Sequence, residues 1–225
     1  MVARRVPGAA ALGLVPPLAA TSVPATALAD AEVMAGLVAA RTPGGAEPRV
    51  AATVWWYSAS AVLMTPTLAG LVTGVPLSAR PADLVLAVGP GGLPVAATSS
   101  ALGADPGAEL RELLTTVIGA LTEAGGVRAR PLWAIATDAL AGQLLTLGRA
   151  VGAVDAVTAL AAPLAGAVGA PLPAPRYVDV GGTRFVRRAS CCLVYRLPDG
   201  PLCTSCPRRP PAERRRLLEE AARWF

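Results

Sequence analysis

The chain has 225 residues, of which 53% are hydrophobic and only 16% are charged, and its formal net charge is +5 at pH 7. Every basic residue is an arginine and histidine is absent, which excludes a P-loop or Schiff-base lysine, histidine-dependent triads, histidine-ligated haem, Rieske clusters and HExxH zinc sites. The four cysteines are therefore the strongest candidates for chemistry, in a chain long enough to bury a proper core.

Residues 1–29 share some features with an export signal. Arg4 and Arg5 precede an alanine-rich stretch that ends in Ala27-Leu28-Ala29, as in a signal peptide with a small-residue cleavage site. The twin arginines lack the pattern that surrounds an export signal, and four prolines interrupt the apolar stretch: Pro7, Pro16, Pro17 and Pro24. We therefore expect an irregular Pro/Ala-rich lead-in and a cytoplasmic protein that keeps its N-terminus.

The sequence pattern over residues 30–175 predicts a helical body that binds a substrate. A short amphipathic helix should run from Asp30 to Arg41 and stop at Thr42-Pro43-Gly44-Gly45. The apolar stretch over residues 50–75 could span a bilayer by its length, but its hydroxyl residues, glycines and Pro66 favour a buried, kinked core helix. At least two of its three adjacent aromatic residues should pack in the core, whereas one could line a substrate pocket: Trp55, Trp56 and Tyr57.

Turn and cap residues divide the rest of this body. Two short strands are predicted on either side of Gly89-Pro-Gly-Gly92, which lacks the motif of a phosphate-binding loop. Asp105-Pro106 should cap a helix that runs to Ala124. Further predictions are a helix over 131–150, one or two short buried helices within 151–170, and a linker at 172–175.

Residues 176–225 form a separate C-terminal segment. The alternating pattern around Gly181-Gly182 predicts a hairpin over 176–187, and Leu197-Pro-Asp-Gly-Pro201 predicts a turn. A terminal amphipathic helix should dock on the body through Leu217, Leu218, Ala221 and Phe225. The expected fold class is mainly α (α+β): a helical body, one or two small β-hairpins and a cysteine-containing segment.

All four cysteines lie in this segment, in the pattern C-C-x10-C-x2-C. Four thiolates so close together indicate one metal-binding unit, and soft thiolates select zinc, copper(I) or iron–sulfur clusters. Cys203 and Cys206 have the spacing of a zinc turn, but the adjacent pair Cys191-Cys192 needs a kinked backbone to reach one small ion. On residue chemistry, zinc and an iron–sulfur cluster both stay open; a vicinal disulfide would be strained.

The stretch from Phe185 to Pro198, followed by Leu202-Cys-Thr-Ser-Cys-Pro207, resembles the C-terminal signature of the FhuF-type siderophore-iron reductases. The two arginines before the cysteine pair and the Tyr195-Arg196 after it also match. The resemblance is close over residues 180–207. It implies that one [2Fe–2S] cluster is bound through all four cysteines: Cys191, Cys192, Cys203 and Cys206.

The resemblance also implies a reaction and its partners. The cluster would pass one electron to chelated Fe(III), and Fe(II), which oxygen ligands hold far more weakly, would be released in the cytoplasm. The expected partners are a ferric siderophore, of hydroxamate type, and an electron donor such as a ferredoxin or an NAD(P)H-dependent reductase.

Positive charge is concentrated around the cysteines. Residues 1–175 carry nine arginines and ten acids, whereas residues 176–225 carry eleven arginines and five acids. This field would favour the more negative reduced form of a cluster and could steer an acidic electron donor. Arg187, Arg188 and Arg196 are the candidates for this docking role; the alternative for each is a solvated basic face.

Two alternatives stay open. One is a zinc-stabilised binding module with a basic tail, although the adjacent cysteines and the scarcity of aromatics among the arginines argue against it and against a nucleic-acid partner. The other is an iron–sulfur electron carrier or sensor, for which the helical body would be oversized. Peripheral contact of the apolar body with the inner face of a membrane also stays open.

Overall fold

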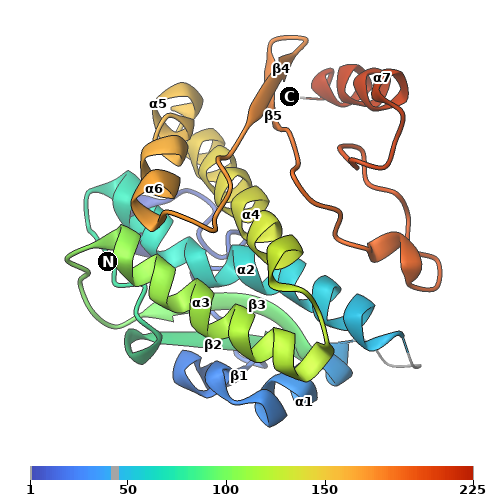
Figure 1. Cartoon of the computed structure of the whole chain (residues 1–225). Helices are drawn as coiled ribbons and strands as arrows, with labels where there is room; N and C mark the ends of the chain where they lie inside the picture. The colour runs from blue at the N-terminus through green and yellow to red at the C-terminus, as the bar shows by residue number, and fades with distance from the viewer. Residues whose placement is uncertain (1, 42–45, 225) are drawn as a thin grey trace.

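The computed structural model describes residues 2–41 and 46–224 and is built around one long buried helix, α2 (Pro48–Thr73). Proline at its first turn starts α2, and Gly74, in the left-handed conformation, ends it. The helix lies between a small sheet and helix α4 (Ala129–Ala150), and Pro66 is accommodated within it (Figure 1). Among the described residues, no helix is both long and apolar enough to cross a membrane.

The aromatic residues of α2 divide as predicted. Trp55 and Trp56 are fully buried, and the Trp56 indole N–H donates a hydrogen bond to the Leu132 carbonyl on α4 at 2.8 Å. Tyr57 is 40% exposed and faces away from this core. The two tryptophans therefore join α2 to its neighbours, and the tyrosine is free to serve a surface cleft.

The sheet contains three antiparallel strands in the order β1-β2-β3: β1 (Thr21–Pro24), β2 (Leu84–Gly89) and β3 (Leu93–Ser99). The predicted β2–β3 hairpin is present, with a register irregularity between Ala87 and Val88. β1 pairs with β2, from Thr21 opposite Val88 to Pro24 opposite Val85. The sheet packs against α2 mainly through β3.

The expectation of an irregular lead-in over residues 1–29 is wrong for much of that stretch. Besides β1, it contains short 3-10 helices at Val2–Arg5 and Ala25–Ala29. Its apolar side chains are buried in the main core, including Val2, Val6 and Leu28. The prolines that break a signal helix do not prevent extended and 3-10 structure, so the segment forms part of the body.

The remaining helices of the body agree with the sequence predictions. Asp30 and Asp105 cap two of them by accepting backbone N–H hydrogen bonds at 2.7 Å from Glu32 and 3.0 Å from Ala108. The stop predicted at residues 42–45 lies outside the described residues. The helices, packed beside α2 and α4, are α1 (Ala31–Arg41), α3 (Pro106–Gly125), α5 (Val154–Thr158) and α6 (Ala161–Val168).

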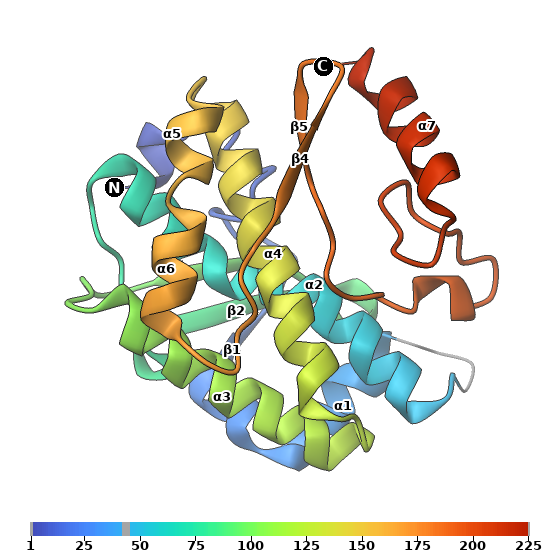
Figure 2. The same cartoon turned by 45° about the horizontal axis from the view of Figure 1, so that its top comes forward.

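The C-terminal segment extends from this body (Figure 2). It contains the predicted hairpin, β4 (Tyr177–Val180) and β5 (Thr183–Val186), then a loop with a short 3-10 turn at Val194–Arg196, and helix α7 (Pro211–Ala222). The prediction that α7 docks on the body is corrected: α7 packs beside β4, and Leu218 is its buried side chain. Phe225, expected on the same face, lies outside the described residues. The helix has only a narrow apolar stripe, which the small hairpin suffices to cover.

Candidate metal centre

The four cysteines lie in the loop between β5 and α7. Cys192 and Cys206 are buried and Cys191 and Cys203 are half-buried, and all four are free thiols. Leu193, directly after the adjacent pair, has a positive φ of 60°, which is unfavourable for a residue with a Cβ. This kink redirects the chain immediately after the adjacent cysteines, into the 3-10 turn at Val194–Arg196.

The thiols form two pairs, and each pair joins the two ends of the motif. Cys192 shares a hydrogen bond with Cys203, and Cys191 shares one with Cys206. The bond from Cys203 is the main reason that the pKa of Cys192 falls to about 5; burial opposes this shift, and a backbone N–H and Arg188 assist it. As the partner in that bond, Cys203 has its pKa raised.

This donor set fits a cluster with two metal ions. A [2Fe–2S] cluster is held by four cysteine thiolates, two at each iron, and the sulfurs here are already grouped in twos. Over residues 2–41 and 46–224, no three His, Cys, Asp or Glu side chains gather closely enough to hold one metal ion.

Arg188 connects the sulfurs to the body. Its Nη1 donates hydrogen bonds to the sulfurs of Cys203 at 3.2 Å and Cys192 at 3.7 Å. Its guanidinium lies over the ring of Tyr57, 4.9 Å from the centroid, and its side chain is only 6% exposed. A fixed positive charge therefore contacts one thiol pair directly.

Asp138, in the middle of α4, holds the start of the cysteine loop. Its two carboxylate oxygens accept backbone N–H hydrogen bonds from Ala189 at 2.7 Å and Ser190 at 3.1 Å, and Oδ2 lies 3.5 Å from Nε of Arg188. Burial raises the pKa of Asp138, while these hydrogen bonds and the guanidinium oppose the rise. Sequence reasoning missed this residue, although a lone acid in an apolar helix was a usable signal.

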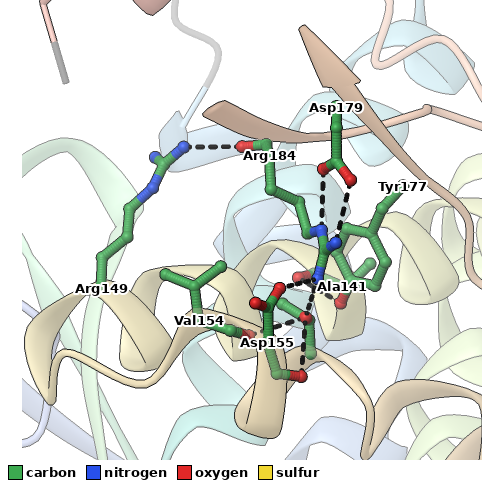
Figure 3. Close-up of polar contacts among 8 residues, drawn as sticks. Ala141, Arg149, Val154, Asp155, Tyr177, Asp179 and Arg184 are labelled. Carbon is green, nitrogen blue, oxygen red and sulfur yellow. Dashed lines mark hydrogen bonds and ion pairs between the residues drawn. The ribbon is translucent and has the colours of Figure 1, made fainter. Parts of the chain in front are cut away.

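The hairpin that delivers the loop is tied to the body through Arg184 (Figure 3). The Arg184 guanidinium makes two parallel bonds of 2.9 Å to the Asp179 carboxylate across the hairpin. Its Nη1 also reaches helix α5, at 2.8 Å from Asp155 and 2.9 Å from Thr158. One arginine thus stiffens the hairpin and fixes it to a neighbouring helix.

Two further bonds join the hairpin to α4 in the same view (Figure 3). Arg149 donates to the Arg184 carbonyl at 2.8 Å, and the Tyr177 hydroxyl donates to the Ala141 carbonyl at 3.0 Å. Burial raises the pKa of Tyr177 to about 12, so its hydroxyl stays a donor throughout the physiological range. Strand β5, which ends shortly before the cysteines, therefore belongs to a hairpin that is held in place on α4 and α5.

A cleft of about 380 Å³ lies beside the cysteine loop, between α2, α4 and β5. Tyr57 and Ser58 line it from α2, and Gln143 and Thr146 line it from α4. The remaining wall includes Phe185, Arg188 and Ser205 from the C-terminal segment. The cleft thus combines hydrogen-bonding groups with an apolar ring, and one of its residues contacts the sulfurs.

The three arginines predicted for docking have different positions. Only Arg188 contacts the sulfurs. Arg187 is exposed at the end of the hairpin, and Arg196 is exposed with its Nη1 3.5 Å from Glu47. The structure thus brings one of the three to the thiols and leaves two at the surface.

Residues 188–208 match the family model of the FhuF 2Fe-2S C-terminal domain. No curated protein matches the chain. The FhuF-type resemblance expected from the cysteine motif is confirmed over this segment, and the cofactor of the segment is a [2Fe–2S] cluster.

Proposed function

We propose that this iron–sulfur protein is a ferric siderophore reductase whose cluster is held by Cys191, Cys192, Cys203 and Cys206. When bound, the cluster supplies one electron at a time. The reaction is the one-electron reduction of chelated Fe(III) to Fe(II), with no bond of the organic ligand broken. The spent electron is replaced by a reduced donor, for which a ferredoxin or an NAD(P)H-dependent reductase is suitable. Release of Fe(II) would take place in the cytoplasm.

The observation that carries this proposal is that the cleft and the thiols share Arg188. This side chain lines the cleft and also donates to two sulfurs, so an acceptor in the cleft would lie one side chain away from the redox centre. The hydroxyls of Tyr57 and Ser205 offer hydrogen bonds to the oxygen atoms of a hydroxamate chelate. Phe185 offers an apolar surface to its organic part.

The donor would approach from the arginine-rich exterior of the same segment. Arg187 and Arg196 are exposed there, where charge steers an acidic partner most effectively at low salt. This leaves the cleft itself to the acceptor.

The test is a single-turnover experiment without oxygen. Chemically reduced protein is mixed with a ferric hydroxamate and a colorimetric ferrous trap, and the visible spectrum is followed. We expect reoxidation of the protein with about one Fe(II) trapped per cluster, because the cluster is a one-electron centre. If reduced protein persists beside several chemically different ferric chelates with the trap present, the chain is an electron carrier or sensor; a colourless protein with stoichiometric zinc would instead support a zinc module.

A further inference from the structure

A second, smaller cavity lies on the other side of Arg188. It measures about 190 Å³ and is bounded by the β4–β5 hairpin, the cysteine loop and α7. Ser205 and several apolar residues line it, and no acidic residue is among its lining residues. It is also lined by four arginines: Arg176, Arg187, Arg188 and Arg214. Such a concentration of one charge in a small hollow is costly unless a negative group compensates it.

The acids nearest in the chain are engaged elsewhere. Asp179 on β4 is bound by Arg184, and Glu213 on α7 is bound by Arg209. Farther along α7, Glu219 and Glu220 pair with arginines one turn before them. The hairpin and α7 therefore bring arginines to this cavity and direct their acids away from it.

The arginines of this cavity have N–H donors that are not used in other hydrogen bonds of the described residues. Arg188 spends Nη1 on the thiols, but its Nη2 is buried without a hydrogen-bond partner among the described residues. Arg214 makes one long contact, 3.5 Å from Nη1 to the Cys206 carbonyl. Within residues 2–41 and 46–224, no ion pair joins Arg176 or Arg187 to an acid. A ligand with several acceptor oxygens would satisfy this set.

We propose that this cavity binds a phosphate group. Guanidinium groups match phosphate oxygens with two parallel hydrogen bonds. Asp138 already faces Arg188, and a dianion compensates more of the charge on the other three arginines than a single carboxylate does. The bound phosphate would bridge the hairpin, through Arg176 and Arg187, to α7, through Arg214. It would also place negative charge next to Arg188 and so weaken the positive field at the thiols. This site does not depend on which acceptor the cluster reduces.

The test is calorimetric titration of the cluster-loaded full-length protein, without oxygen, at constant ionic strength set with chloride. Inorganic phosphate tests a free ion, and a phosphate monoester such as ribose 5-phosphate tests a phosphate carried on a larger molecule. We expect one site per chain for inorganic phosphate and a reduction potential that falls when the site is filled. Equal binding of the monoester would show that the site also accepts an esterified phosphate, and its exclusion would restrict the site to the free ion.

Two variants and one control locate the site. Arg214→Gln and Arg176→Gln should each weaken phosphate binding about tenfold, because each removes one charge-assisted donor. Arg215→Gln, on the same helix but paired with Glu219 and outside the cavity, should bind as the wild type does. Unchanged visible spectra establish that the variants keep the cluster. The proposal is overturned if phosphate gives no heat beyond the chloride control, or if Arg215→Gln weakens binding as much as the cavity variants.

Discussion

The body and the C-terminal segment are stabilised in different ways. The largest fully buried side chains, among them Trp55, Trp56 and Leu114, all belong to the body, whose helices and sheet share one apolar core. From residue 176 onward, only four described hydrophobic residues are buried, and two of these are cysteines: Val180, Cys192, Cys206 and Leu218. The segment is instead held by polar contacts through Arg184, Asp138 and Arg188.

This difference indicates that the two regions depend on different conditions. Apolar burial contributes roughly 25 cal/mol per Å² and needs no cofactor, so the body should fold whether or not iron is present. The loop from 187 to 210 has little apolar burial to offset its conformational entropy, so its order should depend on the metal centre.

The largest effect is expected from removing one of the four proposed cluster ligands. Cys192→Ser should abolish the visible absorption of the cluster and the single-turnover reaction, and the loop should become sensitive to protease while the far-ultraviolet circular dichroism of the body is retained. The measurements are metal analysis, limited proteolysis with mass spectrometry, and circular dichroism. The control is Thr204→Ser, an exposed position in the same loop, which should keep the cluster. A body that unfolds together with the loop would show that the two regions are one cooperative unit.

An intermediate effect is expected from breaking the buried Asp138–Arg188 pair. Asp138→Asn keeps the shape of the side chain but leaves Arg188 without its carboxylate, in a site where both side chains are only 6% exposed. Loss of one partner of a buried pair should destabilise the segment by about 3 kcal/mol, and the cluster should be released at a lower temperature than in the wild type.

Asp155→Asn is the matched control for the Asp138–Arg188 pair, because it removes the carboxylate of an exposed pair with Arg184. Its effect on cluster release should be far smaller. The comparison is made by heating both variants and following visible absorption and circular dichroism in parallel. Equal losses would mean that burial of the Asp138–Arg188 pair has no special importance.

The smallest effect is expected in the cleft. Tyr57→Ala removes one wall of the cleft and the ring over Arg188, and it should slow reoxidation by a ferric hydroxamate about tenfold, or about 1.4 kcal/mol in the barrier. Reoxidation by dioxygen, which needs no cleft, should change little. Tyr195→Ala is the control: Tyr195 also lies under an arginine, Arg208, but outside the cleft. Equal slowing with both oxidants would argue against acceptor binding at this site.

Features encoded in a few neighbouring residues could be predicted from the sequence. Asp105-Pro106 was sufficient to place the start of α3, and Gly181-Gly182 to place the turn of the hairpin. The spacing of the cysteines predicted one metal-binding unit, and the resemblance to the FhuF-type signature, not the spacing alone, predicted the [2Fe–2S] cluster. These signals are local, so they do not depend on how distant parts of the chain meet.

Contacts between distant residues could not be predicted in this way. The pairing of β1 with β2 joins residues more than 60 positions apart, and no pattern near Thr21 indicates it. Asp138 contacts Ala189 and Ser190 across about 50 positions, which only the packing of the segment against α4 brings together. The docking side of α7 was also mispredicted, because its narrow apolar stripe does not reveal which surface will cover it.

Helix α4 carries both the carboxylate that holds the cysteine loop and one wall of the cleft. Asp138 does both, and Thr146 lines the same cleft eight residues later. At 1.5 Å per residue, this corresponds to an axial separation of about 12 Å, so the cleft extends along roughly two turns of one helix. Replacement of Thr146 would therefore reshape the far end of the cleft for a different chelate while the anchor of the cysteine loop at Asp138 stays in place.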